Sequence, residues 1–507
     1  MQRAQYTQSR PADAIRPGPH CHRHHSRIRA PAACFDVIHE VCPATMTVRS
    51  TGFRLERLPY PGDGARLFQV LADRPWAVFL DSGGTAGRRG RYDILAADPF
   101  VTVVTRGGVT RIQERSGVRE SGDDPLRLVA TCLGPRLPPV NGLPFSGGAL
   151  GYFGYDLARR FERLPSLAQD GENLPEMAVG IHDWAVVVDH QEQVAWLVGR
   201  GLDPHTARIW PELLRMLSKA GRGRMRSGFR LRGGIQSNMS REDYQARFAR
   251  VQAFIREGDC YQVNLAQRFS ALAQGDAWGS YQRLRGISPA PFGAFLKLPE
   301  ANILSNSPER FLEVRAGQVS TRPIKGTRPR GANRSADQAQ RAQLASSAKD
   351  RAENVMIVDL LRNDLGKTCA IGSVRVPELF GVESYATVHH LVSAVSGRLA
   401  AGRDALDLLR GCFPGGSITG APKLRAMEII EALEPHRRGV YCGAIGYVGF
   451  DGDMDTSIAI RTLVNSHGQV RFWAGGGITS GSDGEDEYQE TLHKASAMMS
   501  LLRGPAG

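Results

Sequence analysis

The 507-residue sequence contains no run of about 18 apolar residues, although 42% of its residues are apolar. This absence argues against a membrane-spanning helix, and the N-terminal region also lacks the apolar segment of a secretory signal. The eight cysteines include no C-x-x-C pair, which argues against a disulfide framework or a zinc site. We therefore expect a cytoplasmic protein with a sizeable core.

Acidic residues are the minority charge: 51 Asp and Glu stand against 64 Lys and Arg, for a net charge of +13. Such an excess permits binding to a polyanion. The arginines are scattered, however, and form neither an aromatic–basic stripe nor a known nucleic-acid-binding module. We expect no nucleic-acid partner and an anionic small substrate instead.

Composition divides the chain into four stretches. Residues 1–45, rich in arginine, proline and histidine, are typical of a disordered or misassigned extension, a metal tract or a targeting segment; we favour translation starting at Met46. Residues 46–220 have the pattern of strands and hairpins. Residues 221–239, rich in Gly, Arg and Ser, are typical of a linker, and residues 240–503 mix helices with strands.

Local patterns predict individual elements within these stretches. Short β-branched or alternating runs predict strands, and an amphipathic run that ends before Gly258 predicts a helix. The predicted strands are Phe53–Leu58, Ala77–Ser82, Phe100–Val104 and Trp184–Val188, and the predicted helix is Arg241–Glu257.

Lys325 stands in the segment Pro323-Ile324-Lys325-Gly326-Thr327. Proline stiffens the chain before the lysine, and glycine allows the backbone to approach a ligand closely. A partly desolvated lysine loses its proton near neutral pH and then acts as a nucleophile or a base. Taken alone, a lysine in such a turn is more often simply solvated.

Two pairs of carboxylates share a spacing of three residues: Asp350 with Glu353, and Glu487 with Glu490. Both pairs lie in stretches whose apolar spacing predicts helices, so each pair occupies one helix face. If the two faces met, the carboxylates would repel one another without a cation, and oxygen ligands favour Mg²⁺. Either pair alone is more often a solvated helix face.

Long motifs follow one another along the chain. They are Gly258–Leu265, Thr321–Thr327, Lys349–Asn354, Val388–Ser393, Phe413–Lys423, Met454–Ile458 and Glu487–Glu490. Through them, the chain from about Ser240 to about Leu502 resembles the chorismate-utilising enzymes, with a weaker match from about Phe53. The resemblance implies an α+β fold of two antiparallel β-sheets packed together with helices outside. It also implies amination of chorismate at C4, toward p-aminobenzoate and folate, because lysine at position 325 marks that branch and alanine marks the anthranilate synthases.

The same resemblance assigns roles to the charged residues. It implies that Glu353 and Glu490 ligate Mg²⁺ directly and that Asp350 and Glu487 act through water. Our hypothesis for the chemistry is that Lys325 attacks C2 of chorismate. Glu309 would protonate the departing 4-hydroxyl. A surface ion pair of Glu309 with its neighbour Arg310 is the alternative.

Further residues are expected to bind the carboxylates and the ring of chorismate. Arg461, on an apparent strand, suits a bidentate clamp, Tyr447 offers a hydroxyl, and His390 matches the family's histidine near the ring. The other candidates bind anions through the backbone: a glycine nest of Gly475, Gly476 and Gly477, and a helix start at Ser417 and Thr419.

The sequence contains no Gly-x-Cys-x-Gly glutaminase elbow, because the similar stretch Gly411–Gly415 belongs to another motif. We therefore expect ammonia from a separate glutamine amidotransferase subunit. In the N-terminal block, Ser82, Arg91, Tyr92 and Asp93 resemble the family's tryptophan-binding region. Tryptophan is thus a candidate effector, and a structural relic is the alternative.

Two rival functions stay open at this point. The chain also resembles anthranilate, isochorismate and salicylate synthases, and isochorismate-type enzymes use a lysine as the base that activates water. The second rival is a non-catalytic tryptophan-binding regulator on the same fold. The intact metal and nucleophile positions argue against it.

Overall fold

The structure is a computed structural model that describes residues 52–83, 90–140, 142–221, 226–385 and 388–504. The expectations for residues 1–45 therefore lie outside the described residues. Within these ranges, no helix is long and apolar enough to cross a membrane.

The first sheet combines strands from both halves of the chain. Its halves join where Phe79 lies opposite Phe295 in an antiparallel pair. In spatial order the strands are β1 (Arg54–Leu58), β10 (Val194–Gly199), β9 (Trp184–Asp189), β3 (Tyr92–Ala96), β2 (Val78–Asp81), β13 (Phe292–Lys297), β14 (Asn302–Ser307), β23 (Thr462–Ser466), β24 (Gln469–Ile478), β12 (Gln262–Gln274) and β11 (Arg230–Ser237), with β20 (Gly420–Ala421) also paired to β12.

The second sheet is shared in the same way. Its halves join where Gly446 lies opposite Gly151. In spatial order the strands are β17 (Ile324–Pro329), β19 (Val388–Arg398), β16 (Gln318–Thr321), β15 (Arg310–Arg315), β22 (Met454–Ile458), β21 (Ala444–Gly449), β7 (Gly148–Phe153), β8 (Met177–His182), β4 (Val101–Arg106), β5 (Val109–Glu114) and β6 (Gly117–Ser121), with β18 (Arg375–Ser384) also paired to β19. The expected fold of two antiparallel sheets is confirmed.

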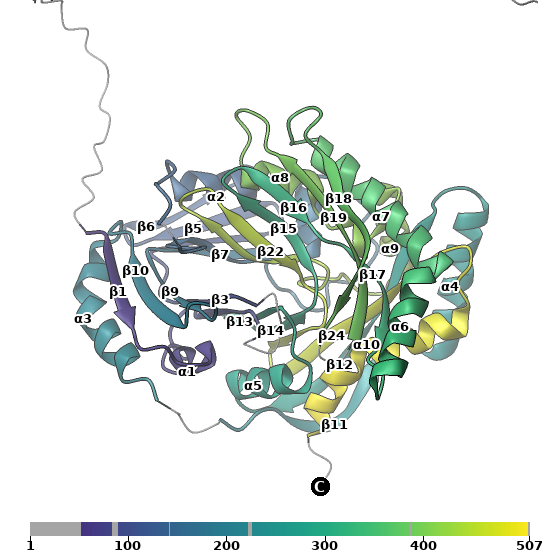
Figure 1. The fold of residues 1–507 in the computed structure, drawn as a ribbon, viewed down its shortest axis with the longest axis horizontal. Helices are drawn as coiled ribbons and strands as arrows, with labels where there is room; N and C mark the ends of the chain where they lie inside the picture. The colour runs from purple at the N-terminus through teal and green to yellow at the C-terminus, as the bar shows by residue number, and fades with distance from the viewer. Residues whose placement is uncertain (1–51, 84–89, 141, 222–225, 386–387, 505–507) are drawn as a thin grey trace, which may run out of the picture. The chain divides into compact units, whose positions relative to one another are not determined.

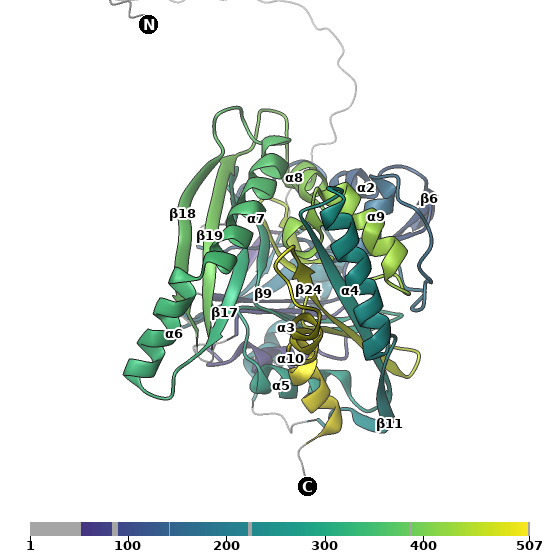
Figure 2. The same cartoon turned by 90° about the vertical axis from the view of Figure 1, so that its right-hand side faces the viewer.

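Helices cover the outer faces of the sheets (Figures 1 and 2). Successive side chains of a strand point to opposite faces, so Val78 joins the core between the sheets while Phe79 joins the core under the helices. The helices are α1 (Gly64–Phe68), α2 (Pro125–Leu133), α3 (Pro204–Ser218), α4 (Arg241–Arg256), α5 (Ala277–Ile287), α6 (Arg334–Ser346), α7 (Ala348–Gly366), α8 (Ala405–Cys412), α9 (Lys423–Leu433) and α10 (Gly484–Arg503), with 3₁₀ turns η2 (Tyr155–Arg160) and η3 (Gly416–Ile418).

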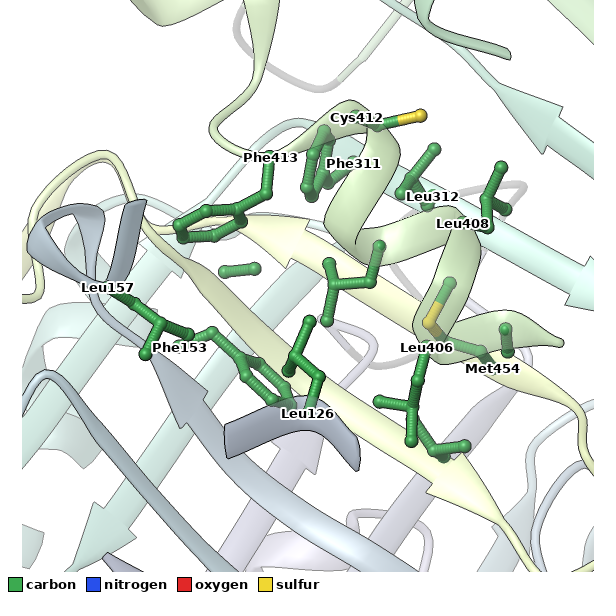
Figure 3. Close-up of a cluster of buried hydrophobic side chains, with 14 of the residues drawn as sticks. Leu126, Phe153, Leu157, Phe311, Leu312, Leu406, Leu408, Cys412, Phe413 and Met454 are labelled. Carbon is green, nitrogen blue, oxygen red and sulfur yellow. The ribbon is translucent and has the colours of Figure 1, made fainter. Parts of the chain in front are cut away.

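A buried apolar cluster fixes the start of β15. Leu408 and Cys412 of α8 share it with Phe311 and Leu312 of β15 and with Phe413 just after α8 (Figure 3). All five side chains are at most 5% exposed. The cluster therefore holds the residues just before Phe311 at a defined place in the interior.

The predicted strands and the predicted helix are confirmed as β1, β2, β4, β9 and α4. The expected linker over 221–239 is wrong in its second part, because Arg230–Ser237 form β11. This strand pairs with β12 only along one side, and most of its side chains are exposed. A strand without a buried face shows no alternation of apolar and polar residues, which is why its composition is like that of a loop.

Candidate active site

Lys325 lies on β17 with its side chain turned into the interior. Its Nζ donates a hydrogen bond to the carbonyl oxygen of Ser417 at 3.3 Å. Burial lowers the pKa of Lys325, and the negative charges of Glu353 and Glu309 oppose that shift. The ammonium group of Lys325 therefore loses its proton more readily than that of a solvated lysine. A nucleophilic lysine needs this, because only the neutral amine attacks.

Glu309 lies next to this lysine, just before β15, and is only 6% exposed. Burial raises the pKa of Glu309, while hydrogen bonding from Ser417 and the charge of Lys325 oppose the rise. The alternative ion pair with Arg310 is wrong, because Arg310 bonds Asp455 at 2.9 Å and Glu313 at 3.0 Å. Consecutive residues point to opposite faces here, so the acid faces the lysine and the arginine faces away.

The two carboxylate pairs lie on α7 and α10, as the sequence predicts. Burial raises the pKa of Glu353, and the charge of Glu490 on the other helix contributes to the rise. The two helices therefore bring these carboxylates toward each other. Glu490 bonds Lys494 at 2.6 Å, whereas Glu353 makes no hydrogen bond or ion pair with any described residue.

The other two carboxylates have polar partners. Asp350 accepts from Arg328 at 3.0 Å, and Glu487 accepts from Ser482 at 2.7 Å. In the described ranges, no group of three or more His, Cys, Asp and Glu side chains is placed to hold a metal ion. Mg²⁺ takes one or two carboxylates and fills its other positions with water and substrate oxygens, so Glu353 and Glu490 fit its chemistry as the two protein ligands.

Arg461 is a cation without an anion. It lies between β22 and β23 with φ at +50°, not within a strand as expected. Such a backbone is uncommon for a residue other than glycine and is frequent at functional sites. Burial lowers the pKa of the guanidinium, and no carboxylate of the described chain pairs with it.

His390 on β19 lies beside this arginine. Burial, followed by the charge of Arg461, lowers the pKa of His390 to about 4. Its Nδ1 lies 2.9 Å from Oγ1 of Thr327 on β17. The structure therefore brings a neutral imidazole and an unpaired guanidinium together near the strand that carries Lys325.

The glycine run is not an anion nest. Gly475 and Gly476 lie within β24, opposite Ala266 and Leu265 of β12. Backbone N–H groups alternate in direction along a strand, so the run does not form a compact nest; a role of these glycines in binding the substrate stays a prediction. A Cβ on Gly476 would lie 2.5 Å from an oxygen of Glu487, so the missing side chain makes room for α10.

The expected helix start at Ser417 and Thr419 is also wrong. The helix α9 begins at Lys423, because Gly420–Ala421 pair with β12 as a short strand. Thr419 is fully buried and its hydroxyl donates to Gly415 at 3.0 Å. Ser417, by contrast, touches both Lys325 and Glu309, a link that only the three-dimensional structure reveals.

Tyr447 lies in a different place from the one expected. It lines a cavity of about 480 Å³ together with Ser82, Arg91 and Tyr92, and its hydroxyl accepts from Arg315. Its place in the chorismate site was therefore wrong. Ser82, Arg91 and Tyr92, three of the four residues expected in an effector pocket, thus line one cavity together with Tyr447.

Asp93, the fourth effector candidate, supports this cavity from behind. It is completely buried and accepts hydrogen bonds from the amide and the hydroxyl of Ser82 at 2.9 and 2.8 Å. Its other oxygen lies 2.7 Å from Nε2 of His190. Asp93 thus orients Ser82 and does not line the cavity itself.

The sequence pattern of the chorismate binding enzymes matches residues 84–500. The chain therefore belongs to the chorismate binding enzyme family. It is 50% identical over 451 residues to aminodeoxychorismate synthase component 1 of Klebsiella aerogenes, covering 88% of this chain and 98% of that one. The Escherichia coli K12 protein of the same name is 49% identical over 438 residues, or 86% and 95% of the two chains. The crystal structure of anthranilate synthase component I from Streptococcus pneumoniae matches with a TM-score of 0.73 at 31% identity, covering 82% and 93%.

Proposed function

We propose that this chain is the chorismate-aminating component of an aminodeoxychorismate synthase. It replaces the 4-hydroxyl of chorismate with an amino group. The observation that carries the proposal is the joint placement of Lys325 and Glu309 at Ser417. A nucleophile of lowered pKa and an acid of raised pKa at one position are what this substitution requires. Relatives of that name match over nearly their whole length.

Chorismate carries two carboxylates, and the site offers a separate partner for each. Arg461 has no anion in the described chain and is free to bind one carboxylate through a bidentate pair. Glu353 and Glu490 would hold Mg²⁺, which supplies positive charge for the other carboxylate. His390 is neutral and contributes an uncharged wall near the ring.

The substitution proceeds in two steps. The neutral amine of Lys325 forms a bond to C2, the ring double bonds shift, and the C4–O bond breaks as Glu309 gives its proton to the leaving hydroxyl. Ammonia then forms a bond to C4, the double bonds shift back and the C2–N bond to Lys325 breaks. The surplus proton of the new amine returns to Glu309. Chorismate and ammonia are thus converted to aminodeoxychorismate and water.

Ammonia would come from a separate glutamine amidotransferase subunit. The relatives are named as component 1, which implies a second component, and the sequence lacks a glutaminase elbow. The cavity lined by Ser82, Arg91 and Tyr92 would bind tryptophan as an effector. Its mixed polar and aromatic wall suits an amino acid with a large ring.

The test is to incubate the purified protein with chorismate, Mg²⁺ and ammonium at mildly alkaline pH and to identify the product by chromatography and mass. We expect aminodeoxychorismate. Anthranilate, isochorismate or salicylate would assign a sister activity. Absence of turnover, even with a glutaminase subunit and glutamine, would refute catalysis by this chain.

A further inference from the structure

One buried arginine lies behind the active site and takes no part in the mechanism above. Arg438 follows α9 and is 1% exposed, and its partner Glu434 is 5% exposed. The two form a bidentate pair, with Nε to Oε2 at 2.9 Å and Nη2 to Oε1 at 2.6 Å. Burial of such a pair costs much of what its attraction gains, and apolar side chains often fill such a place with equal or greater stability.

The other hydrogen bonds of this guanidinium reach two of the family's motif segments. Nη1 donates to the carbonyl of Ile418 at 2.9 Å, and Nη2 donates to the carbonyl of Asn264 at 2.8 Å. The side-chain amide of Asn264 donates to the same Ile418 carbonyl at 2.9 Å. The carbonyl group next to Ser417 is therefore held by two donors from different elements.

Two aromatic rings lie beside the guanidinium. The ring of Tyr155 lies 4.9 Å from Cζ of Arg438, and the ring of Tyr441 lies 5.7 Å away. Tyr441 stacks in turn on Trp473 of β24, at 5.9 Å between ring centres and 7° between ring planes. A fork of donors held beside two aromatic rings is a geometry that arginine provides and lysine does not.

We propose that Arg438 is a positioning residue for the catalytic pair. It anchors the Ile418 carbonyl and thereby fixes the preceding residue, Ser417, whose carbonyl accepts from Lys325 and whose side chain reaches Glu309. The inference rests on the proposed roles of that lysine and that acid. A displacement of the turn by about 1 Å would separate them enough to cost on the order of 10²-fold in rate.

The main test is Arg438→Lys, measured as ammonia-dependent amination. Lysine keeps the charge but cannot serve Glu434, Ile418 and Asn264 at once. We expect kcat to fall about 10- to 100-fold while KM for chorismate changes less than about threefold, because the substrate contacts themselves are intact. We also expect the limb of the pH–rate profile that reports Lys325 to move to higher pH.

Arg159→Lys is the matched control. Arg159 on η2 also bonds two carboxylates, Asp156 at 3.0 Å and Glu431 of α9, and its side chain is 17% exposed. Neither partner touches Lys325 or Glu309. We expect this variant to lose thermal stability without any change in the shape of the pH–rate profile.

A second measurement separates this inference from the proposed function. The reaction of Lys325 with an amine-reactive acylating reagent, followed by peptide mass against pH, reports its ionisation without turnover. In Arg438→Lys we expect the inflection to move up toward that of an ordinary lysine, because a loosened turn admits water.

The labelling experiment decides the inference even if the wild-type protein makes no aminodeoxychorismate, an outcome that would refute the proposed function alone. Glu434→Gln, which keeps the shape of the side chain and weakens the bidentate pair, should shift the inflection in the same direction by less. The positioning role is overturned if the inflection and kcat stay at wild-type values in folded Arg438→Lys. It is also overturned if Arg159→Lys changes both to the same extent.

Discussion

The candidate active site and the cavity proposed for an effector meet at the start of β15, where Glu309 belongs to the site and Arg310 lines the cavity, yet they hold their charges in opposite ways. In the cavity, Arg310 is paired with Asp455 and Glu313, and Arg91 is paired with Asp189 at 2.8 Å. In the active site, neither the side chain of Arg461 nor that of Glu353 forms a direct ion pair or hydrogen bond within the part of the chain that the structure describes, although Lys325 lies near Glu353.

The difference separates charges that support the fold from charges kept for a ligand. Paired charges satisfy one another whether or not a ligand is bound. A desolvated charge without a partner costs folding free energy, and a ligand of opposite charge recovers that cost on binding. Arg461 is therefore suited to one carboxylate of the substrate and Glu353 to a cation, while the cavity, whose charges are paired, suits a ligand that brings little net charge.

The largest effect is expected for Lys325→Ala. Removal of the nucleophile should lower kcat for ammonia-dependent 4-amination by about 10³-fold or more. The measurement is product formation under saturating chorismate. Lys297→Ala, at a half-exposed lysine paired with Asp73, is the control and should keep the wild-type rate. Full activity of Lys325→Ala would rule out the covalent role.

Glu309→Gln should lower kcat by about 10²- to 10⁴-fold, the range for a general acid. The pH dependence has a definite sign. Wild-type activity should rise with pH as Lys325 loses its proton, at a pKa lowered by burial, and fall as Glu309 loses its proton, at a pKa raised by burial. The variant should lack the limb that reports the acid. If the profile of kcat/KM against pH is the same in Glu309→Gln as in the wild type, the fall in activity at higher pH belongs to a group other than Glu309.

Two arginine variants test the difference between the unpaired Arg461 and the paired Arg310. Arg461→Met should raise KM for chorismate about 100-fold, because two charge-assisted hydrogen bonds at roughly 1.5 kcal/mol each are lost. It should leave the stability of the free protein unchanged or higher. Arg310→Met should instead lower the free energy of unfolding by about 2 kcal/mol, because Asp455 and Glu313 lose their partner. Urea unfolding measures the free energy of unfolding, and steady-state kinetics measures KM for chorismate. A loss of stability in Arg461→Met would contradict the view that this arginine is kept for a ligand.

The smallest effect concerns the effector cavity. Tryptophan at 100 times its dissociation constant should stabilise the protein by about 2.7 kcal/mol, seen as a rise in Tm. Ser82→Ala should reduce that rise, because it removes a hydroxyl that Asp93 orients at the cavity wall. An identical rise in the variant would place tryptophan elsewhere, and no rise in the wild type would leave the cavity without this ligand.

Much of the fold could be predicted because its signals are local. The helix predicted around Glu487 and Glu490 is α10, Gly484–Arg503, since apolar spacing and capping act within a few turns. Motif order identified the family. The strand β11 escaped notice because an exposed edge strand carries no alternating pattern.

The candidate site was predicted less completely, because side-chain direction depends on register between distant strands. A shift of one residue moves a side chain to the other face of a sheet, which is why Tyr447 was expected in the wrong cavity. No local signal in the sequence marked the left-handed backbone of Arg461 or the contact of Ser417 with Lys325.

The most direct test of the covalent mechanism is the mass of the protein after incubation with chorismate and Mg²⁺ in the absence of any ammonia source. We expect an adduct of chorismate less one water on the peptide that contains Lys325, and discharge of this adduct as aminodeoxychorismate when ammonium is added. An enzyme that aminates chorismate but never carries that adduct, even under rapid quenching, would contradict the role assigned to Lys325.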